Sequence, residues 1–174
     1  MTSVTYGRRA VFRNQRWAEL FFEVCHDSRR KGRFLVHEFV LMPDHFHMLL
    51  TPAPEVSLEK ALQFIKGGFS FRAKRELRSN LEVWQPSFTE HRIQDWNDYA
   101  HHREYIQQNP VRARLVERAA DYPYGSASGR FELDAAPPWL KPQPRGDEDA
   151  GLKPRSSTGS RSSTETGGVG ERGA

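Results

Sequence analysis

The sequence predicts an α+β fold in which helices cover one face of an antiparallel sheet, with the ferredoxin-like arrangement as the nearest common form. Two observations lead to this class. Apolar patterns with the periods of strands and helices follow one another in the order strand, helix, two strands, helix, strand, helix. The last third of the 174-residue chain is instead rich in Pro, Gly, Ser and Thr and poor in apolar residues. We therefore expect one domain over residues 1–130 and a mostly disordered tail over residues 131–174.

The first strand and the first helix follow from local patterns. Residues 2–6 alternate β-branched and small side chains until Gly7 ends the run, which predicts a short strand. Asn14 can cap a helix that runs to about Lys31, and Gly32 is a favourable residue to end it. The apolar residues of this helix recur at helical spacing and share one face: Trp17, Leu20, Phe21 and Val24.

A β-hairpin and a second helix are expected next. Residues 34–42 and 45–51 are rich in strand-forming residues, and the Pro43–Asp44 pair between them is typical of a turn. Ser57 can cap the second helix, whose buried stripe is Leu58, Ala61, Leu62, Ile65 and Phe69. The Gly67–Gly68 pair predicts a bend or close packing, because glycine is about 1 kcal/mol less favourable than alanine in a helix.

An edge strand and a third helix complete the domain. Residues 84–93, limited by Pro86 and Asp95, are too few for a helix and are expected to hold the edge strand. Asp95 can cap a helix that reaches Asn109. Pro110 is expected to end this helix, because proline disfavours a helical conformation in the residue before it.

The composition limits the class of protein. A net charge of +4 fits a polyanionic partner without requiring one. Cys25 is the only cysteine, which excludes an intramolecular disulfide and a cysteine-based metal site. The sequence has neither an apolar run of about 18 residues nor a basic-then-apolar leader, so we expect a soluble cytoplasmic protein without a membrane span.

Two histidines in the second strand of the hairpin are candidate metal ligands. Side chains alternate between the two faces of a strand, so His45 and His47 share one face while Phe46, Met48 and Leu50 take the other. Two imidazoles roughly 7 Å apart at their Cα atoms can converge on one ion. The alternative is structural, with one histidine satisfying the turn and the other lying on a solvated face.

Tyr105 is a candidate nucleophile on the third helix. It lies on the polar side, between His101 and Asn109, whereas a structural tyrosine normally lies within or beside the apolar stripe. A surface tyrosine without a role is the alternative. A phenolate can form a covalent intermediate with phosphate, and a metal ion can polarise a scissile phosphodiester. An amide oxygen of Asn109 would complete a ligand set with His45 and His47, for which Mg²⁺ or Mn²⁺ is expected.

These residues lie in segments that resemble the single-tyrosine HUH transposases, especially the REP-associated tyrosine transposases. His45-Phe46-His47, inside the wider block of residues 42–47, matches the motif of two histidines around a large hydrophobic residue. Residues 105–113 are similar to the tyrosine helix of the family and to the Asn-Pro turn after it. Residues 84–88 and 121–126 also agree with the family, so the resemblance covers roughly residues 2–127.

The resemblance implies a metal-dependent enzyme that acts as a homodimer on hairpin-forming single-stranded DNA. The tyrosine of such enzymes forms a 5′-phosphotyrosine link and leaves a free 3′-hydroxyl, which later reverses the step at another end. By motif, Tyr105 is the nucleophile, and His45 and His47 are the metal ligands. Asn109 takes a position at which related insertion-sequence enzymes carry a glutamine.

Two features depart from the family pattern. Only five residues precede Tyr6, whereas the first strand of the family usually follows a longer lead. Arg114 stands where a glycine is usual after the Asn-Pro turn. If that position requires a positive φ, a residue other than glycine is strained there.

Basic residues near the two motifs are candidate contacts to DNA phosphates. They lie on the second helix and after the tyrosine: Lys66, Arg72, Lys74, Arg75, Arg112 and Arg114. A solvated helix surface is the alternative for them. Two other functions stay open, a catalytically inactive or domesticated nucleic-acid-binding protein and a metal-dependent hydrolase that activates water.

Overall fold

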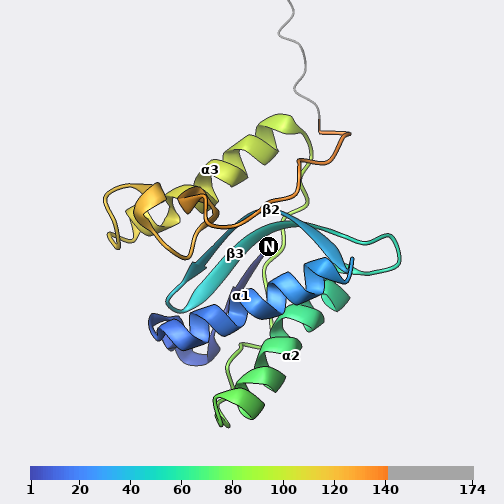
Figure 1. The fold of residues 1–174 in the computed structure, drawn as a ribbon. Helices are drawn as coiled ribbons and strands as arrows, with labels where there is room; N and C mark the ends of the chain where they lie inside the picture. The colour runs from blue at the N-terminus through green and yellow to red at the C-terminus, as the bar shows by residue number, and fades with distance from the viewer. Residues whose placement is uncertain (141–174) are drawn as a thin grey trace, which may run out of the picture. The chain divides into compact units, whose positions relative to one another are not determined.

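The computed structural model describes residues 1–140, which contain a three-stranded antiparallel sheet (Figure 1). Its strands are β1 (Thr2–Val4), β2 (Phe34–Met42) and β3 (His45–Pro52), in the order β1-β3-β2. β2 and β3 form the predicted hairpin. β3 is the central strand, so its backbone is hydrogen-bonded to a neighbour on each side.

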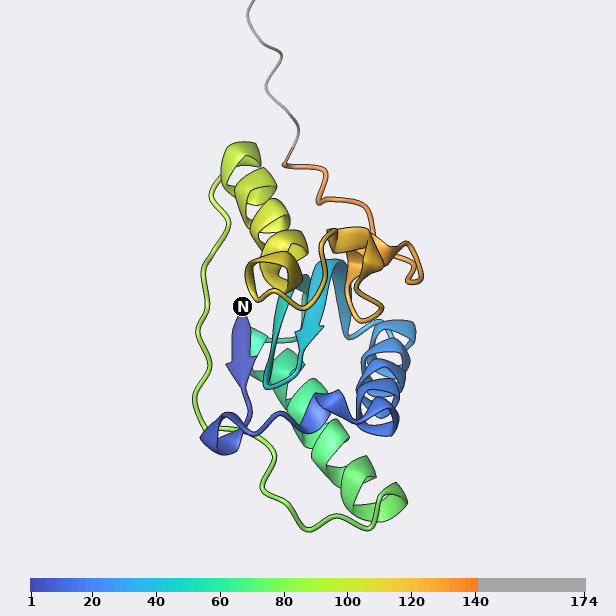
Figure 2. The same ribbon diagram turned by 90° about the vertical axis from the view of Figure 1, so that its left-hand side faces the viewer.

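Helices cover both faces of this sheet (Figures 1 and 2). α1 (Gln15–Arg30) and α2 (Leu58–Glu76) pack together on one face, as the ferredoxin-like arrangement predicts. α3 (Trp96–Arg112) lies on the opposite face, outside that arrangement. In β2, every residue except Leu35 is buried. A strand that is buried on both faces needs a cover on each face, and for this reason helices lie on both sides of the sheet. The α+β class and the antiparallel sheet are confirmed.

The helices begin where the sequence predicted. Each predicted cap residue accepts a backbone hydrogen bond in the first turn: Asn14, Ser57 and Asp95. Gly32 follows α1 with a φ of 66°. A Cβ atom on Gly68 would lie 3.1 Å from Cγ1 of Val24, so the predicted close packing joins α2 to α1. Short 3₁₀ helices lie at Tyr6–Arg8, Val11–Arg13, Ala119–Asp121 and Ser126–Ser128.

The expected edge strand is reduced to two isolated bridges beside β1. Thr89 pairs with Thr2, and Trp84 pairs with Thr5. Pro86 lies between the two bridges and has no amide hydrogen to donate, so a continuous ladder does not form. The segment still occupies the position of the fourth strand of a ferredoxin-like sheet, next to β1.

The end of α3 corrects the prediction that Pro110 stops the helix, because Pro110 lies inside the last turn. Its ring is buried, which favours keeping this turn packed against the domain. The amide of Leu115 bonds to the carbonyl of Pro110, and the amide of Arg114 bonds to that of Val111. These are the two bonds of a Schellman helix end, and Arg114 has the positive φ, 56°, that this end requires. Arg114 therefore occupies a position that favours glycine.

The packed part of the chain extends past the boundary expected at residue 130. Asp134 accepts two hydrogen bonds from the guanidinium of Arg29, and Leu140 is buried. Residues 131–140 thus pack with the domain, while the remainder of the expected tail lies outside the described residues. Within the described part, no helix is long and apolar enough to cross a membrane.

Candidate active site on the central strand and the third helix

Both candidate metal ligands lie on the face of β3 that looks toward α3. The imidazole rings of His45 and His47 are 4.8 Å apart between centroids. Phe46 and Met48 point the other way and are buried between the sheet and the helices α1 and α2. The predicted alternation therefore holds, because the apolar residues anchor the strand while the two imidazoles lie side by side.

Each imidazole is held through its Nδ1 atom. Nδ1 of His45 lies 2.6 Å from Oδ1 of Asp44, and Nδ1 of His47 lies 2.6 Å from Oγ1 of Thr2, its partner in β1. A carboxylate only accepts, so Nδ1 of His45 donates and Nε2 keeps the lone pair in the neutral ring. Within residues 1–140, neither Nε2 atom has a hydrogen-bond partner. Both rings are oriented through Nδ1, so the Nε2 atom of each ring is the one left for a ligand.

The surroundings keep His47 neutral at pH 7. Burial, together with the charges of His45 and of the Met1 amino group, lowers the pKa of His47 to about 4. Burial alone would raise the pKa of Asp44, but His45 and Arg8 hold it below its ordinary value. A neutral imidazole can bind a metal ion, and the carboxylate of Asp44 orients the second imidazole for the same role. The donor set therefore fits a divalent ion.

Tyr105 approaches this pair from α3. The centroid of its ring lies 5.5 Å from that of His47, and 38% of the residue is exposed. The guanidinium of Arg112 lies 5.1 Å from the centre of the tyrosine ring. The phenol is therefore accessible from solvent, next to the histidines and next to a positive charge. The structure brings together the nucleophile and both ligands predicted from the sequence.

Asn109 lies one turn after Tyr105, and its contacts are local. Its amide nitrogen lies 3.5 Å from the carbonyl oxygen of Tyr105. No hydrogen bond joins Asn109 to His45 or His47 in the described part of the chain. Its role as a third ligand stays a prediction.

A buried carboxylate fixes α3 over the sheet. Glu38 of β2 is fully buried, and its Oε2 accepts hydrogen bonds from Nε of Arg103 at 2.9 Å and from Nε2 of Gln107 at 2.8 Å. Burial raises the pKa of Glu38, and the two donors oppose this effect. Arg103 and Gln107 flank Tyr105 in the sequence, so Glu38 holds the part of the helix that carries the tyrosine. Nothing in the sequence marked Glu38, because a single acidic residue in an apolar strand does not reveal its partners.

Two further site residues, Asp44 and Thr2, are not among those predicted from the sequence. Asp44 precedes His45 directly, so its position could have suggested that it orients this histidine. Thr2 gave no such signal, because its place opposite His47 depends on the register of β1 against β3.

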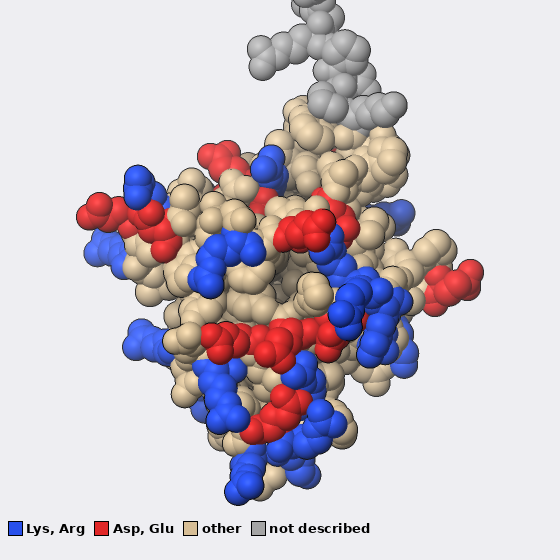
Figure 3. All heavy atoms as spheres, in the orientation of Figure 1, with Lys and Arg blue, Asp and Glu red and all other residues tan. Residues whose placement is uncertain are grey.

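The basic residues predicted to contact DNA fall into two groups. Arg72 pairs with acidic side chains of α1 and α2, namely Glu23, Asp27 and Glu76. Lys66 donates to the carbonyl of Gln85 at 2.7 Å, and Arg75 pairs with Glu76. Figure 3 shows acidic and basic side chains interleaved in the lower half of the view, over α1 and α2. Lys74, Arg112 and Arg114 form no ion pair with any other described residue.

Comparisons with known proteins identify the family of the chain. The family model described as "Transposase IS200 like" matches residues 1–109, a span that includes both histidines, Tyr105 and Asn109. A REP-associated tyrosine transposase of Escherichia coli (strain K12) is 30% identical over 114 residues, which cover 62% of this chain and 66% of the relative. A putative REP-associated tyrosine transposase of Haemophilus influenzae is 32% identical over 96 residues, covering 49% and 54% of the two chains.

A solved structure shares the fold. The structure of the REP-associated tyrosine transposase bound to a REP hairpin is similar with a TM-score of 0.62 and 26% sequence identity, over 78% of this chain and 82% of that chain. The chain spans just under two thirds of the E. coli relative, at 66%, and about half of the H. influenzae relative, at 54%. The family model covers more than half of the chain and includes the candidate site. The resemblance seen in the sequence is thus confirmed, and the chain belongs to the IS200-like transposase family.

Proposed function

We propose that the chain is a transposase and single-strand endonuclease that cuts and rejoins hairpin-bearing DNA, with Tyr105 as the nucleophile. The observation that carries this proposal is the approach of Tyr105, on α3, to within 5.5 Å of the His47 ring on β3. The tyrosine is exposed and lies beside His47, whose ring is 4.8 Å from that of His45, an arrangement suited to nucleophilic attack on phosphate. The hairpin substrate is proposed from the similar solved structure, in which the transposase is bound to a REP hairpin.

The proposed reaction is a transesterification. The Tyr105 oxygen gives up its proton and attacks the phosphorus atom, forming a 5′-phosphotyrosine bond while the bond from phosphorus to the 3′-oxygen breaks. The departing 3′-oxygen takes up a proton and becomes a hydroxyl. Attack by a 3′-hydroxyl on the phosphotyrosine reverses the step and rejoins the strand. Each step exchanges one phosphoester bond for another, so no further reactant is consumed.

A divalent ion at the histidine pair is part of the proposal. His45 and His47 would hold it through Nε2, with Asn109 as the proposed third ligand. Mg²⁺ and Mn²⁺ both fit, and imidazole nitrogens favour Mn²⁺. When bound, such an ion polarises the phosphate and stabilises its developing charge. The contribution of the chain itself is orientation, because Asp44 and Thr2 fix the two rings.

Basic residues near Tyr105 are the proposed contacts to the DNA backbone. Arg112 lies against the tyrosine ring, and Arg114 is exposed just after α3. Lys74 and Arg75 are exposed on α2, which covers the opposite face of the sheet, and are proposed as a separate group of contacts. Binding through phosphates predicts that DNA affinity falls steeply as the salt concentration rises.

The proposal is tested with Tyr105→Phe, which removes only the attacking oxygen. Full-length protein incubated with labelled single-stranded hairpin DNA and Mn²⁺ should form a protein–DNA adduct that survives denaturation. The variant should form none, while its DNA affinity stays within about threefold of the wild type. Tyr6→Phe, at another exposed tyrosine, is the matched control and should form the adduct at the wild-type level.

Three results would assign a different role. Adduct formation by Tyr105→Phe would refute this nucleophile. Hairpin binding by the wild type without cleavage or adduct would favour a catalytically inactive or domesticated nucleic-acid-binding protein. Cleavage without an adduct would favour a hydrolase that activates water.

A further inference from the structure

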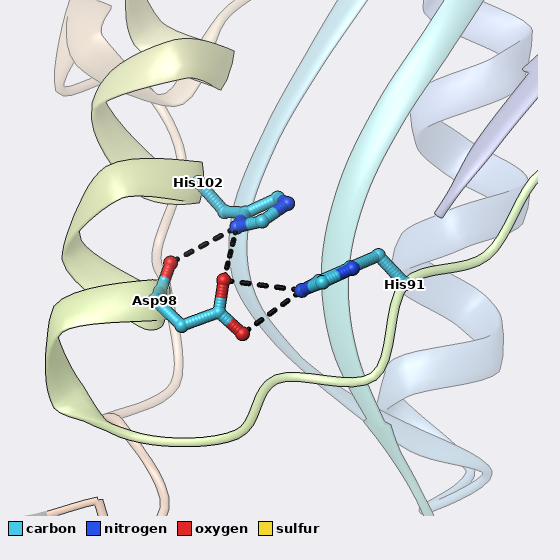
Figure 4. A group of neighbouring side chains, drawn as sticks. All are labelled: His91, Asp98 and His102. Atoms are coloured by element: carbon cyan, nitrogen blue, oxygen red, sulfur yellow. Dashed lines mark hydrogen bonds and ion pairs between the residues drawn. The ribbon is translucent and has the colours of Figure 1, made fainter.

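A second cluster of metal-binding groups consists of His91, Asp98 and His102 (Figure 4). His91 comes from the segment between α2 and α3, and the other two residues lie one helical turn apart on α3. The ligand atoms of the three side chains all lie within 4.8 Å of one another. In the described part of the chain, no other three His, Cys, Asp or Glu side chains come together in this way. The proposed DNA chemistry uses none of these residues.

The distances within the cluster suit a small metal ion. Nε2 of His91 lies 2.9 Å from Oδ2 of Asp98, and Nδ1 of His102 lies 2.9 Å from Oδ1 of the same carboxylate. The two imidazole rings are stacked, with centroids 4.3 Å apart. In a tetrahedral site with metal–ligand bonds of about 2.0–2.1 Å, neighbouring ligand atoms are roughly 3.3 Å apart. Two of the three ligand pairs therefore need only a slight separation to admit the ion.

We propose that His91, Asp98 and His102 bind one divalent transition-metal ion of the zinc type. Two imidazole nitrogens and one carboxylate oxygen form a donor set that zinc accepts, whereas Mg²⁺ prefers oxygen ligands throughout. The i, i+4 spacing of Asp98 and His102 directs both side chains to one side of α3. The His91 side chain is 50% exposed, so a water molecule from solvent can complete the coordination.

The hydrogen bonds of the cluster are compatible with this binding. Nε2 of His91 faces the carboxylate of Asp98, and Nδ1 of His102 faces both this carboxylate and the main-chain carbonyl of Asp98, so both nitrogens carry a hydrogen in the metal-free form. Metal binding replaces these two hydrogens, leaves one hydrogen on the other nitrogen of each ring, and ends the hydrogen bond from His102 to the main-chain carbonyl. The amide of Gln94 donates to Oδ2 of Asp98 at 2.9 Å and keeps the carboxylate oriented.

The cluster joins two segments of the chain, because His91 precedes α3 while Asp98 and His102 lie on it. The bound ion would join the segment before α3 to the helix that carries Tyr105, three residues after His102. Because the unfolded chain does not hold the three ligands together, the ion stabilises the folded state.

The test uses full-length protein in which His45 and His47 are both replaced by alanine, so that the candidate active site does not contribute to binding. Calorimetric titration with ZnCl₂ should show one site per chain, and zinc should raise the melting temperature. Adding His91→Ala should weaken zinc binding at least about tenfold, because even residues that only orient a metal ligand have effects of this size. It should also remove the thermal shift.

His101→Ala is the matched control, because His101 is exposed, adjacent to His102 and outside the cluster. It should change zinc affinity by less than about twofold. Zinc binding that is equal in the parent and in His91→Ala would overturn the proposal, as would an equal loss in His101→Ala. If the parent does not fold by circular dichroism, the same comparison in the wild-type chain should show that His91→Ala removes one of two sites. The DNA adduct assay is independent of these results, so the two proposals fail separately.

Discussion

At the scale of single residues, the two histidines of the candidate active site differ in the group that orients them. Nδ1 of His45 faces the carboxylate of Asp44, whereas Nδ1 of His47 faces the hydroxyl of Thr2. A carboxylate partner raises the basicity of an imidazole, because its negative charge stabilises positive charge on the ring and on a bound cation. We therefore expect Asp44 to contribute more to metal affinity than Thr2.

Asp44→Asn tests this by keeping the shape of the side chain and removing its charge. The affinity for Mn²⁺ measured by calorimetry should fall about 10- to 100-fold, the range for residues that orient a metal-binding histidine. Arg8→Gln is the control, because it removes the ion pair with Asp44 but leaves the carboxylate on His45. The control should change the affinity less than about threefold. Equal losses in the two variants would show that Asp44 does not act through His45.

The candidate residues that do chemistry could be predicted from the sequence better than the residues that support them. His45 and His47 share one face of a strand whose other face is apolar, and Tyr105 lies on the polar side of its helix, and both patterns are visible in a short stretch of sequence. Thr2 and Glu38 contact residues of other elements, β3 and α3, and these contacts exist only in the tertiary structure. Local periodicity therefore predicts the residues proposed to do the chemistry, but not the residues that position them.

At the scale of elements, the end of α3 shows tertiary packing overriding a local preference. Pro110 disfavours a helical conformation at Asn109, yet α3 continues to Arg112 because the proline is buried and its carbonyl accepts a hydrogen bond from Leu115. The continued helix then places Arg114 in the left-handed conformation, where glycine is favoured.

Arg114→Gly should therefore increase the free energy of unfolding by about 1 kcal/mol, because glycine adopts the positive φ without a clash between Cβ and the backbone. Urea denaturation at pH 7 measures the change. Arg112→Gly is the control of opposite sign and should decrease stability by about 1 kcal/mol, since Arg112 lies within the helix. A destabilising Arg114→Gly would mean that the arginine side chain contributes more than its backbone conformation costs.

The segment that follows residue 130 is attached to the domain by a partly buried carboxylate. Asp134 accepts two hydrogen bonds from Arg29 of α1 and one from the amide of Val36 of β2. The hydrogen bond from Arg29 is the main reason that the pKa of Asp134 is below its ordinary value. A lowered pKa in the folded state stabilises the fold above the unfolded pKa of about 3.9, and this stabilisation is lost as pH falls through the folded-state pKa.

Asp134→Asn should lower the free energy of unfolding by about 1–3 kcal/mol at pH 7. The difference from the wild type should shrink at about pH 3, below the unfolded-state pKa of about 3.9, because protons then bind the unfolded wild-type chain more strongly than the folded one. Urea denaturation at the two pH values checks both statements. Glu132→Gln is the control, because Glu132 is exposed and 3.8 Å from Arg29, so its effect should stay below about 1 kcal/mol. A difference that does not change with pH would rule out the ionised carboxylate as its source.

At the scale of the whole molecule, the order of elements could be predicted, but the face that each helix covers could not. The alternation of strand and helix patterns was sufficient for the α+β class, because each pattern is local. The position of α3 depends on which apolar side chains of the sheet remain uncovered by α1 and α2: Val40, Met42 and Leu49. The proposed function depends on that position, because α3 carries Tyr105 to the ring of His47 on β3.

The candidate site is assembled within one chain. β3 provides His45 and His47, α3 provides Tyr105, and Glu38 fastens α3 to the sheet of the same chain. Tyr105 and the two histidines are therefore brought together without residues of a second copy. We expect Tyr105 to act with the histidines of its own chain, whatever the oligomeric state.

A mixing experiment distinguishes this arrangement from a dimer that exchanges α3. One variant, Tyr105→Phe, lacks the nucleophile, and the other lacks both histidines through His45→Ala and His47→Ala. The two are mixed in equal amounts, unfolded and refolded together, and assayed for the adduct with hairpin DNA. Because no chain in the mixture carries a complete site, adduct formation should stay at background. If α3 were exchanged, mixed dimers would hold one intact site, and about a quarter of wild-type activity would return. Wild type refolded with Tyr105→Phe is the control for recovery and should keep about half of its activity in either case.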